Sequence, residues 1–181
     1  MFCETIRHRA AIGGYVVDAC SNRPIAGAAV TLADQGLQML TREDGFFYFI
    51  DIPSGQYTLH ILAPELGSRY GAVTVSNLTV ANDPEGRPIF DGKANVGLPP
   101  TRLAGHVVRA DNQQPIQGAT VGLRASAIKT TTNKQGEFAF SAVEAGTQTM
   151  QALAPGFTTL SRLVSLSAGQ EATVDISLTP S

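Results

Sequence analysis

Apolar and polar residues alternate along short stretches of this chain, and turn residues separate the stretches. Between Ala10 and Asp18 the residues Ile12, Gly14 and Val16 fall on one side of an alternating stretch, and the same period recurs through 27–34 and 56–63. A period of two places successive side chains on opposite faces of a β-strand. About seven such strands are expected in the first half of the chain, a number typical of a β-sandwich.

The whole pattern occurs twice. The stretch PIAGAAVTL at 24–32 recurs as PIQGATVGL at 115–123, an offset of 91 residues. The same offset relates glycines, aromatic residues and an Ala-Pro pair elsewhere in the chain. The related residues are Gly14 and Gly105, Val16 and Val107, Gly45 and Gly136, Phe47 and Phe138, Phe49 and Phe140, Gly55 and Gly146, and Ala63-Pro64 and Ala154-Pro155. A repeat of this length predicts two tandem domains of one fold.

The domain boundaries are placed by turn and proline residues. A tail is expected at 1–9, a first domain at 10–99 and a second domain at 100–181. Pro99-Pro100 marks the boundary because proline cannot donate to a strand ladder. The first domain carries extra residues before its last strand, and we expect them in a long loop at 82–92.

Charge and composition exclude several classes of partner. The chain has 181 residues, 15% of them charged, and a net charge of −2. Lysine and arginine are scattered singly, so we expect neither a nucleic-acid partner nor binding to an anionic membrane surface. No stretch approaches the length of a membrane span, and membrane insertion is not expected either.

The compartment is inferred from the first residues and the cysteines. Residues 1–9 carry charges where a secretory signal has a continuous apolar run. This predicts a cytoplasmic protein, or one within a particle assembled there. Cys3 and Cys20 are expected to be reduced thiols, because disulfides are rare in the cytosol. Whether they pair in an oxidising compartment is left open.

The motifs of both copies resemble the carboxypeptidase regulatory-like domain. In the first copy they are Ile12-x-Gly14-x-Val16, PIAGAAVTL, Thr41-x-x-Asp44-Gly45-x-Phe47-x-Phe49, Ile52-Pro53-Ser54-Gly55-x-Tyr57-x-Leu59 and Ala63-Pro64. In the second copy they are Leu103-x-Gly105-x-Val107, PIQGATVGL, Gly136-x-Phe138-x-Phe140 and Ala154-Pro155-Gly156-Phe157. The resemblance implies an all-β chain of two tandem seven-stranded antiparallel β-sandwiches of the transthyretin-like type. It also implies non-catalytic modules that stiffen, space or dock other parts of proteins.

One segment suggests a hydrolase as a remote alternative. Gly105-His106-Val107-Val108 resembles the first histidine motif of transthyretin-like 5-hydroxyisourate hydrolases, which share this fold. Those enzymes also end in a Tyr-Arg-Gly-Ser type tail, whereas this chain ends Leu178-Thr179-Pro180-Ser181. General acid–base catalysis needs several positioned groups. We therefore expect no enzyme and no catalytic residue, with His106 an ordinary strand residue.

Metal binding and isopeptide cross-links are not expected. His8, His60 and His106 show no ligand spacing, and the two cysteines form no CxxC pair. Asp83, Glu85 and Asp91 of the loop 82–92 could offer oxygen ligands to calcium, but they lack the alternating pattern of a calcium loop. An isopeptide bond between Asn95 and an early-strand lysine is rejected, because the only lysines are Lys93, Lys129 and Lys134.

The two copies differ on one predicted sheet face. Alternation that turns Phe47 and Phe49 inward turns the neighbouring aromatic residues outward, where the second copy has glutamate and alanine. The next strand is expected to pair with this one and to add two polar side chains. The candidate interface comprises Phe46, Tyr48, Thr58, His60, Ile89 and Phe90. Either a partner binds this surface, or the loop 82–92 folds over it.

Two functions of different classes fit this chain. The first is a non-catalytic structural or adaptor protein that docks in a larger protein assembly, of which a phage-tail-like particle is one example by analogy. Its partners would be other protein subunits, and a homo-oligomer is left open. The second is a surface or secreted module that binds carbohydrate or another ligand, with Phe46 and Tyr48 stacked on sugar rings. No cofactor is expected for either function.

Overall fold

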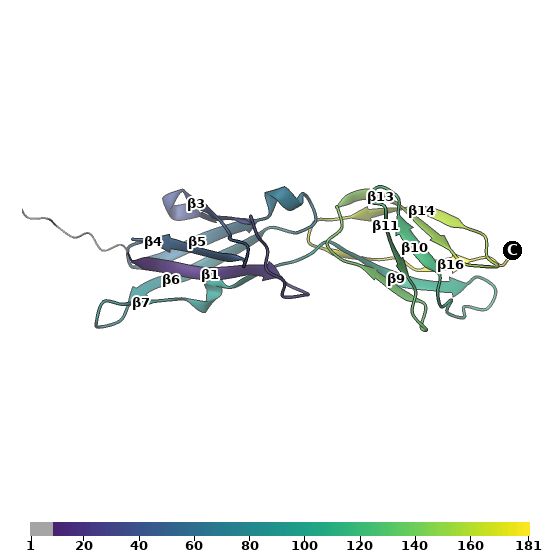
Figure 1. Ribbon diagram of the computed structural model, residues 1–181, viewed down its shortest axis with the longest axis horizontal. Coiled ribbons are helices and arrows are strands. Elements are labelled where there is room, and N and C mark those ends of the chain that lie inside the picture. The colour runs from purple at the N-terminus through teal and green to yellow at the C-terminus, as the bar shows by residue number, and fades with distance from the viewer. Residues whose placement is uncertain (1–8) are drawn as a thin grey trace, which may run out of the picture. The chain divides into compact units, whose positions relative to one another are not determined.

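The structure is a computed structural model that describes residues 9–181, and its regular elements are β-strands and short 3-10 helices. The chain divides into two units (Figure 1). Unit 1 comprises the chain up to Leu66 together with Ala72–Pro99, and unit 2 comprises Gly67–Gly71 together with Pro100–Ser181. Each unit contains two sheets, and the predicted all-β sandwich fold is confirmed.

Unit 1 is built from two sheets of unequal size. Its strands are β1 (Ala10–Asp18), β2 (Ala29–Leu32), β3 (Leu37–Leu40), β4 (Phe46–Ile50), β5 (Gly55–Leu62), β6 (Val73–Asn82), β7 (Pro88–Ile89) and β8 (Val96–Leu98). One sheet has the order β4-β1-β8, and the other has the order β3-β2-β5-β6-β7. β1 pairs antiparallel with β4 and parallel with β8.

Alternate side chains of these sheets form the core of unit 1. On β4, Phe47 and Phe49 are buried and their ring centroids lie 6.2 Å apart. The other sheet contributes Leu32, Leu59 and Ile61, all fully buried. Burial of a large apolar side chain contributes about 1.5–3 kcal/mol. A strand that slipped by one residue would lose this burial along one face, so the alternation also fixes which side chains point outward.

Unit 2 repeats this plan. Its strands are β9 (Arg102–Arg109), β10 (Thr120–Leu123), β11 (Ile128–Thr131), β12 (Glu137–Phe140), β13 (Gly146–Leu153), β14 (Leu160–Leu166), β15 (Glu171–Thr173) and β16 (Ile176–Leu178). One sheet has the order β12-β9-β15, with β16 also paired to β9, and the other has the order β11-β10-β13-β14. Phe138, Phe140 and Met150 lie in its core.

In each unit the closing segment passes over a glycine of the first strand. In unit 1 a Cβ on Gly14 would collide with the carbonyl oxygen of Ala94, which belongs to the 3-10 helix η3 (Gly92–Ala94). In unit 2 a Cβ on Gly105 would collide with the carbonyl oxygen of Val174. A side chain at either position would push the closing segment away, so both copies of the fold need glycine here.

Two details differ from the predicted seven-stranded antiparallel sandwich. First, the closing strands β8, β15 and β16 pair parallel with the first strand of their unit. Second, each unit has eight strands in the described part of the chain. In unit 1 the extra strand is the two-residue β7 within the long loop, and in unit 2 the closing segment is divided where Val174 passes Gly105.

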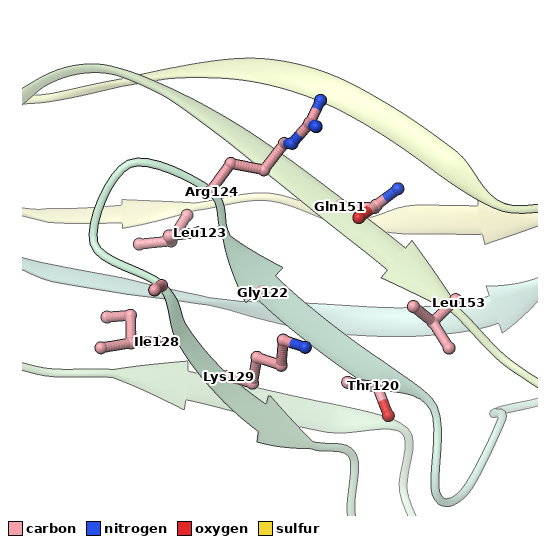
Figure 2. Close-up of a pocket in the computed structure, with 9 residues that line it drawn as sticks. Thr120, Gly122, Leu123, Arg124, Ile128, Lys129, Gln151 and Leu153 are labelled. Atoms are coloured by element: carbon pink, nitrogen blue, oxygen red, sulfur yellow. The ribbon is translucent and has the colours of Figure 1, made fainter.

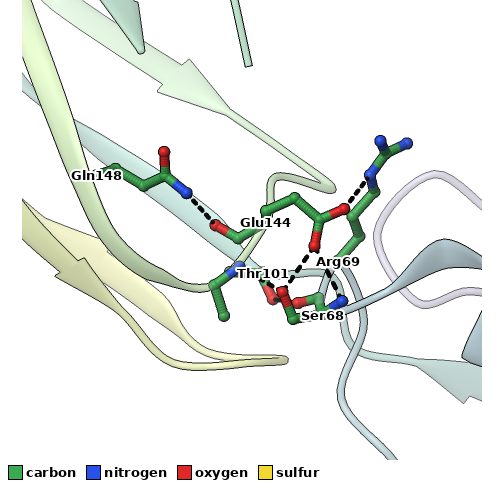
Figure 3. Close-up of polar contacts among 6 residues, drawn as sticks. Ser68, Arg69, Thr101, Glu144 and Gln148 are labelled. Carbon is green, nitrogen blue, oxygen red and sulfur yellow. Dashed lines mark hydrogen bonds and ion pairs between the residues drawn. The ribbon is translucent and has the colours of Figure 1, made fainter. Parts of the chain in front are cut away.

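The segment Gly67–Gly71 lies in sequence between β5 and β6 but belongs to unit 2. There the Ser68 hydroxyl donates to Glu144 Oε2 at 2.7 Å and the Ser68 backbone N–H donates to the same oxygen at 3.0 Å (Figure 3). Arg69 Nε donates to Glu144 Oε1 at 2.9 Å, and Thr101 Oγ1 donates to the Ser68 carbonyl at 2.8 Å. The hydrogen bonds from Ser68, followed by Arg69, hold the pKa of Glu144 below its ordinary value of 4.5.

Candidate interaction surface on unit 1

Aromatic side chains gather on the outer face of the β4-β1-β8 sheet. Phe46 and Tyr48 point outward on β4 because Phe47 and Phe49 point into the core. Tyr15 lies directly opposite Phe46 in the register of β1 and β4, with the ring centroids 5.2 Å apart. The rings of Phe46 and Tyr48 are 6.0 Å apart, with 24° between their planes. These separations are typical of favourable aromatic pairs.

A fourth ring reaches this face from the long loop. Gly13 lies opposite Tyr48, so the outer face has no side chain at this point of β1. The Phe90 ring lies over the glycine, because a Cβ on Gly13 would be 3.3 Å from Phe90 Cε1. Beside this ring a hollow of about 400 Å³ remains open, which we call the aromatic hollow. It is bordered by Gly13, Tyr15, Phe46, Tyr48, Phe90 and Asn95.

One polar side chain, Asn95, borders the aromatic hollow, and one cation, Arg42, lies against two of its rings. The guanidinium carbon of Arg42 lies 5.9 Å from the ring centroid of Phe46 and 5.4 Å from that of Tyr48. Both distances fall within the range of cation–π attraction. Asn95 Oδ1 accepts a hydrogen bond from the Tyr15 backbone N–H at 3.1 Å. The site therefore combines ring faces, one cation and one amide, and the residues that border it include no carboxylate.

The loop covers this face only in part. Phe90 contacts the floor of the aromatic hollow, yet 53% of its surface is exposed, as is 53% of the adjacent Ile89. Tyr15 is 47% exposed. Of the two alternatives left open by the sequence, a covering loop therefore accounts for some of the buried aromatic surface and leaves the rest in contact with solvent.

Thr58 and His60 lie elsewhere, which corrects their expected position beside Phe46. Their expected position followed from pairing β4 with β5 across a hairpin. Instead β4 pairs with β1, while β5 pairs with β2 and β6 in the other sheet. There the Thr58 N–H donates to Asp34 Oδ2 at 2.7 Å, and His60 Nδ1 lies 2.9 Å from Thr74 Oγ1. Consecutive strands of a sandwich often cross from one sheet to the other.

Tyr15 was missing from the predicted set although a signal for it exists. Ile12 and Val16 are buried, so alternation along β1 places Tyr15 on the outer face. The second copy has His106 at this position. A search for outward positions that differ between the copies would therefore have found Tyr15.

The corresponding face of unit 2 is polar. Glu137 and Ala139 stand where β4 has its outward aromatic residues, and His106 lies opposite Glu137 on β9. His106 Nδ1 lies 3.1 Å from Asp175 Oδ1, and His106 Nε2 lies 3.7 Å from Glu137 Oε1. All three side chains are at least half exposed. The arrangement is that of a surface charge cluster on a solvated sheet, and it does not add to the hydrolase alternative.

No metal centre is found in the part of the chain that the structure describes. Within residues 9–181 no group of three or more His, Cys, Asp or Glu side chains could hold a metal ion. Cys20 is exposed, while Cys3 and His8 lie outside the described residues. The same range contains no helix long and apolar enough to cross a membrane.

The carboxylates of Asp83 and Asp91 accept hydrogen bonds from the loop 82–92 and from residues beside it. Asp83 Oδ1 accepts from the Arg87 backbone N–H at 2.7 Å, and this bond is the main reason that the pKa of Asp83 is lowered. Asp91 accepts from the backbone N–H groups of Lys93 and Thr79 at 3.0 and 2.8 Å, which lowers its pKa in the same way. These bonds hold the loop in the conformation that delivers Phe90 to the aromatic hollow.

Solved structures similar to this chain include pilins. The TIE protein of Bacillus anthracis is 12% identical with a TM-score of 0.44, and the match covers 95% of this chain and 34% of that one. The shaft pilin SpaA of Lactobacillus rhamnosus GG is 12% identical with a TM-score of 0.43, covering 98% of each chain. The minor pilin of Streptococcus agalactiae is 12% identical with a TM-score of 0.38, covering 94% of this chain and 95% of that one.

The expected cytoplasmic location is withdrawn, because these matches do not support it. The prediction rested on the charges in residues 1–9, and the start of a sequence does not determine the compartment of the protein. The chain spans about a third of the length of the TIE protein. At this level of similarity the likeness concerns the fold.

The family is established by a match over most of the sequence. A comparison with curated proteins gives no match. The model of the carboxypeptidase regulatory-like domain matches residues 11–88 and again residues 102–179. Domains of this family are non-catalytic, which is consistent with a chain that is not an enzyme. The resemblance seen in the sequence motifs is confirmed, and the chain belongs to the carboxypeptidase regulatory-like domain family, with two copies of the domain in tandem.

Proposed function

We propose that this chain is a non-catalytic structural or adaptor protein that docks a protein partner at the aromatic hollow of unit 1. The observation that carries the proposal is the contrast between two faces of the same fold. Unit 1 presents Tyr15, Phe46, Tyr48 and Phe90 where unit 2 presents a solvated polar surface. The fold itself does not need these rings, because unit 2 forms the same sheet without them.

The composition of the hollow suits a protein interface. Tyrosine, phenylalanine and arginine are enriched at the centres of interfaces, where they supply large contact areas with few rotatable bonds. Arg42 lies beside the rings and can donate hydrogen bonds to a partner while its plane covers an aromatic face. Ile89 and Phe90 are exposed at the rim and would extend the contact. Other subunits of an assembly are the partners that this proposal requires.

A ligand-binding module for carbohydrate is the second candidate. It is favoured by the small angle between the rings of Phe46 and Tyr48, which form a platform on which a sugar ring could stack. Arg42 and Asn95 are the polar groups next to that platform. Few polar groups converge on the hollow, whereas sugar specificity requires several hydrogen bonds. The protein interface is therefore the stronger proposal.

The double substitution Phe46→Glu with Tyr48→Ala tests the proposal. It gives β4 the residues that β12 carries as Glu137 and Ala139, so unit 1 should fold as unit 2 does. We expect the far-ultraviolet circular dichroism and the thermal unfolding to be retained. We expect the wild-type chain to sediment with a protein partner in native lysate and the variant to sediment alone. The matched control is Glu137→Gln, which alters the same place on unit 2.

Either of two results would contradict the proposal. One is a folded Phe46→Glu/Tyr48→Ala variant that still sediments with its partner. The other is a wild-type chain that sediments alone, near its mass of 19.0 kDa. In that second case, binding of soluble oligosaccharides that is lost in the same variant would support the carbohydrate module.

A further inference from the structure

The β11-β10-β13-β14 sheet of unit 2 has a hollow on its outer face where a side chain is missing. Gly122 lies on β10 between Val121 and Leu123, whose side chains are buried, so Gly122 belongs to the outer face. Lys129 on β11 and Gln151 on β13 lie directly opposite it on either side. The gap above the glycine is a hollow of about 260 Å³ (Figure 2).

Two cations border this hollow without an anionic partner. Arg124 follows β10, and Lys129 lies on the neighbouring strand (Figure 2). Within residues 9–181 neither side chain makes an ion pair or a hydrogen bond. Three other arginines of unit 2 are paired with carboxylates, namely Arg69, Arg102 and Arg109, and Arg102 lies 2.6 Å from Glu171. The four strands of this sheet contain no aspartate or glutamate, so the positive charge stays uncompensated.

Apolar side chains border the hollow as well. Leu153 is 42% exposed and Ile128 is 36% exposed, and both lie at its margin (Figure 2). The volume falls below the roughly 300–1,000 Å³ of a site that encloses a whole small molecule. A hollow of this size, with apolar walls, can accept one apolar side chain of a larger partner.

The equivalent positions of unit 1 show which features of this hollow the fold requires. The apolar pair is kept there as Leu37 and Leu62, whereas Thr31, Ala33 and Gln38 replace Gly122, Arg124 and Lys129. A Cβ at Gly122 would lie 3.2 Å from Lys129 Cγ, so the glycine also makes room for the lysine stem across β10. The open floor and both cations are therefore specific to unit 2.

We propose that this hollow docks an extended, carboxylate-bearing segment of a protein partner. One apolar side chain of that segment occupies the space between Ile128 and Leu153, and carboxylates on either side of it pair with Arg124 and Lys129. Charge complementarity selects this occupant, because the face offers two free cations and no anion. A nucleic acid requires a larger basic surface than these two cations provide. The site lies on unit 2 and is independent of the aromatic hollow.

The test uses the full chain, labelled with 15N, and two capped synthetic peptides. One peptide has the sequence Glu-Asp-Leu-Asp-Glu, and the other has its neutral counterpart Gln-Asn-Leu-Asn-Gln. We expect the acidic peptide to shift the backbone amide resonances of Gly122, Lys129 and Gln151 in a saturable titration. The neutral peptide should bind more weakly. Raising the salt to about 0.5 M should weaken binding of the acidic peptide, because exposed charges are then screened.

Two variants separate the charges from the hollow. Arg124→Ala with Lys129→Gln copies the residues of unit 1 and should weaken binding of the acidic peptide by roughly twofold to thirtyfold, as the loss of two exposed ion pairs implies. Gly122→Thr keeps both cations but fills the floor with the residue that unit 1 has there, and it should also weaken binding. The matched charge control is Lys134→Gln with Arg162→Gln, which removes two exposed cations that do not line the hollow and should bind like the wild type.

Several results would overturn this proposal. They are an acidic peptide that gives no saturable shifts, equal binding of the neutral peptide, or unchanged binding by the Arg124→Ala/Lys129→Gln variant. An equal loss in the Lys134→Gln/Arg162→Gln control would also overturn it, since that loss would mean attraction to net charge alone. The Phe46→Glu/Tyr48→Ala variant should bind the acidic peptide normally. Failure of this proposal can therefore be distinguished from failure of the proposed function at the aromatic hollow.

Discussion

Gly13 and Gly122 illustrate how the absence of one side chain shapes an outer sheet face. Each lies at an outward position of an inner strand, and each has larger residues on the neighbouring strands. A hollow results above both glycines, one bordered by aromatic rings and the other by cations. Because the rest of each strand still pairs normally, the hollow forms without loss of strand hydrogen bonds. The identity of the neighbours then decides what each hollow can bind.

Gly14→Ala should destabilise unit 1. The added methyl group would collide with the backbone carbonyl of Ala94, which cannot move without shifting η3 and the closing strand β8. Overpacking of this kind costs about 1–3 kcal/mol. The control is Gly92→Ala, because nothing lies within 4 Å of a Cβ at that position. Thermal unfolding of both variants measures the difference, and an equal midpoint would mean that the close approach does not constrain the fold.

At the scale of elements, β4 and β12 show one backbone with two outer surfaces. Both strands bury two phenylalanines and both pair antiparallel with the first strand of their unit. Only β4 carries aromatic residues outward, and only unit 1 has the loop 82–92 that brings Phe90 over them. The inward residues stabilise the core, and the outward residues can contact a partner.

The segment Gly67–Gly71 provides a prediction about pH. Its contact with Glu144 lowers the pKa of that carboxyl, so the charged form stabilises unit 2 and this stabilisation is present above pH 4.5. It is lost as the pH falls below 4.5 through the lowered pKa of the folded state. Glu144→Gln should therefore reduce the free energy of unfolding near neutral pH by about 1 kcal/mol, a value kept low because the side chain is partly exposed to solvent.

Denaturant unfolding of wild type and Glu144→Gln at several pH values measures this effect. The difference between them should shrink as the pH falls below 4.5 through the lowered pKa of the folded state, because the wild-type carboxyl then becomes protonated and neutral like the amide. Exchange of the Ser68 and Ala145 amide protons reports on the same contact, since both donate within it. A difference in stability that stays constant with pH would show that the carboxylate charge does not hold this segment.

The sequence predicted the strands and the core better than it predicted the candidate site. Alternation and duplication were sufficient to place Phe47 in the core and Phe46 outward, because a period of two leaves no other arrangement for a half-buried strand. The pairing of strands is not encoded in that period, so Thr58 was placed beside Phe46 although it lies in the other sheet. The path of the long loop depends on hydrogen bonds between distant residues, such as Asp91 with Thr79.

At the scale of the whole molecule, duplication allows one fold to carry two kinds of surface. The copies share many inward residues, such as Phe47 with Phe138 and Phe49 with Phe140, and they share turn glycines and the glycine under the closing segment. They differ on the outer faces. Unit 1 has an aromatic hollow on its β4-β1-β8 sheet, and unit 2 has a cationic hollow on its β11-β10-β13-β14 sheet. A chain with two distinct docking faces can join two different partners, which is what an adaptor requires.

The most direct test of this account is site-specific photo-crosslinking at two equivalent positions. A photoreactive amino acid is placed at Tyr48 on β4 in one variant and at Ala139 on β12 in the other, and both proteins are irradiated in native lysate. We expect a discrete covalent adduct with a protein from position 48 and none from position 139. Adducts from position 139 alone, or no adduct from position 48, would contradict the claim that the aromatic hollow is the docking surface.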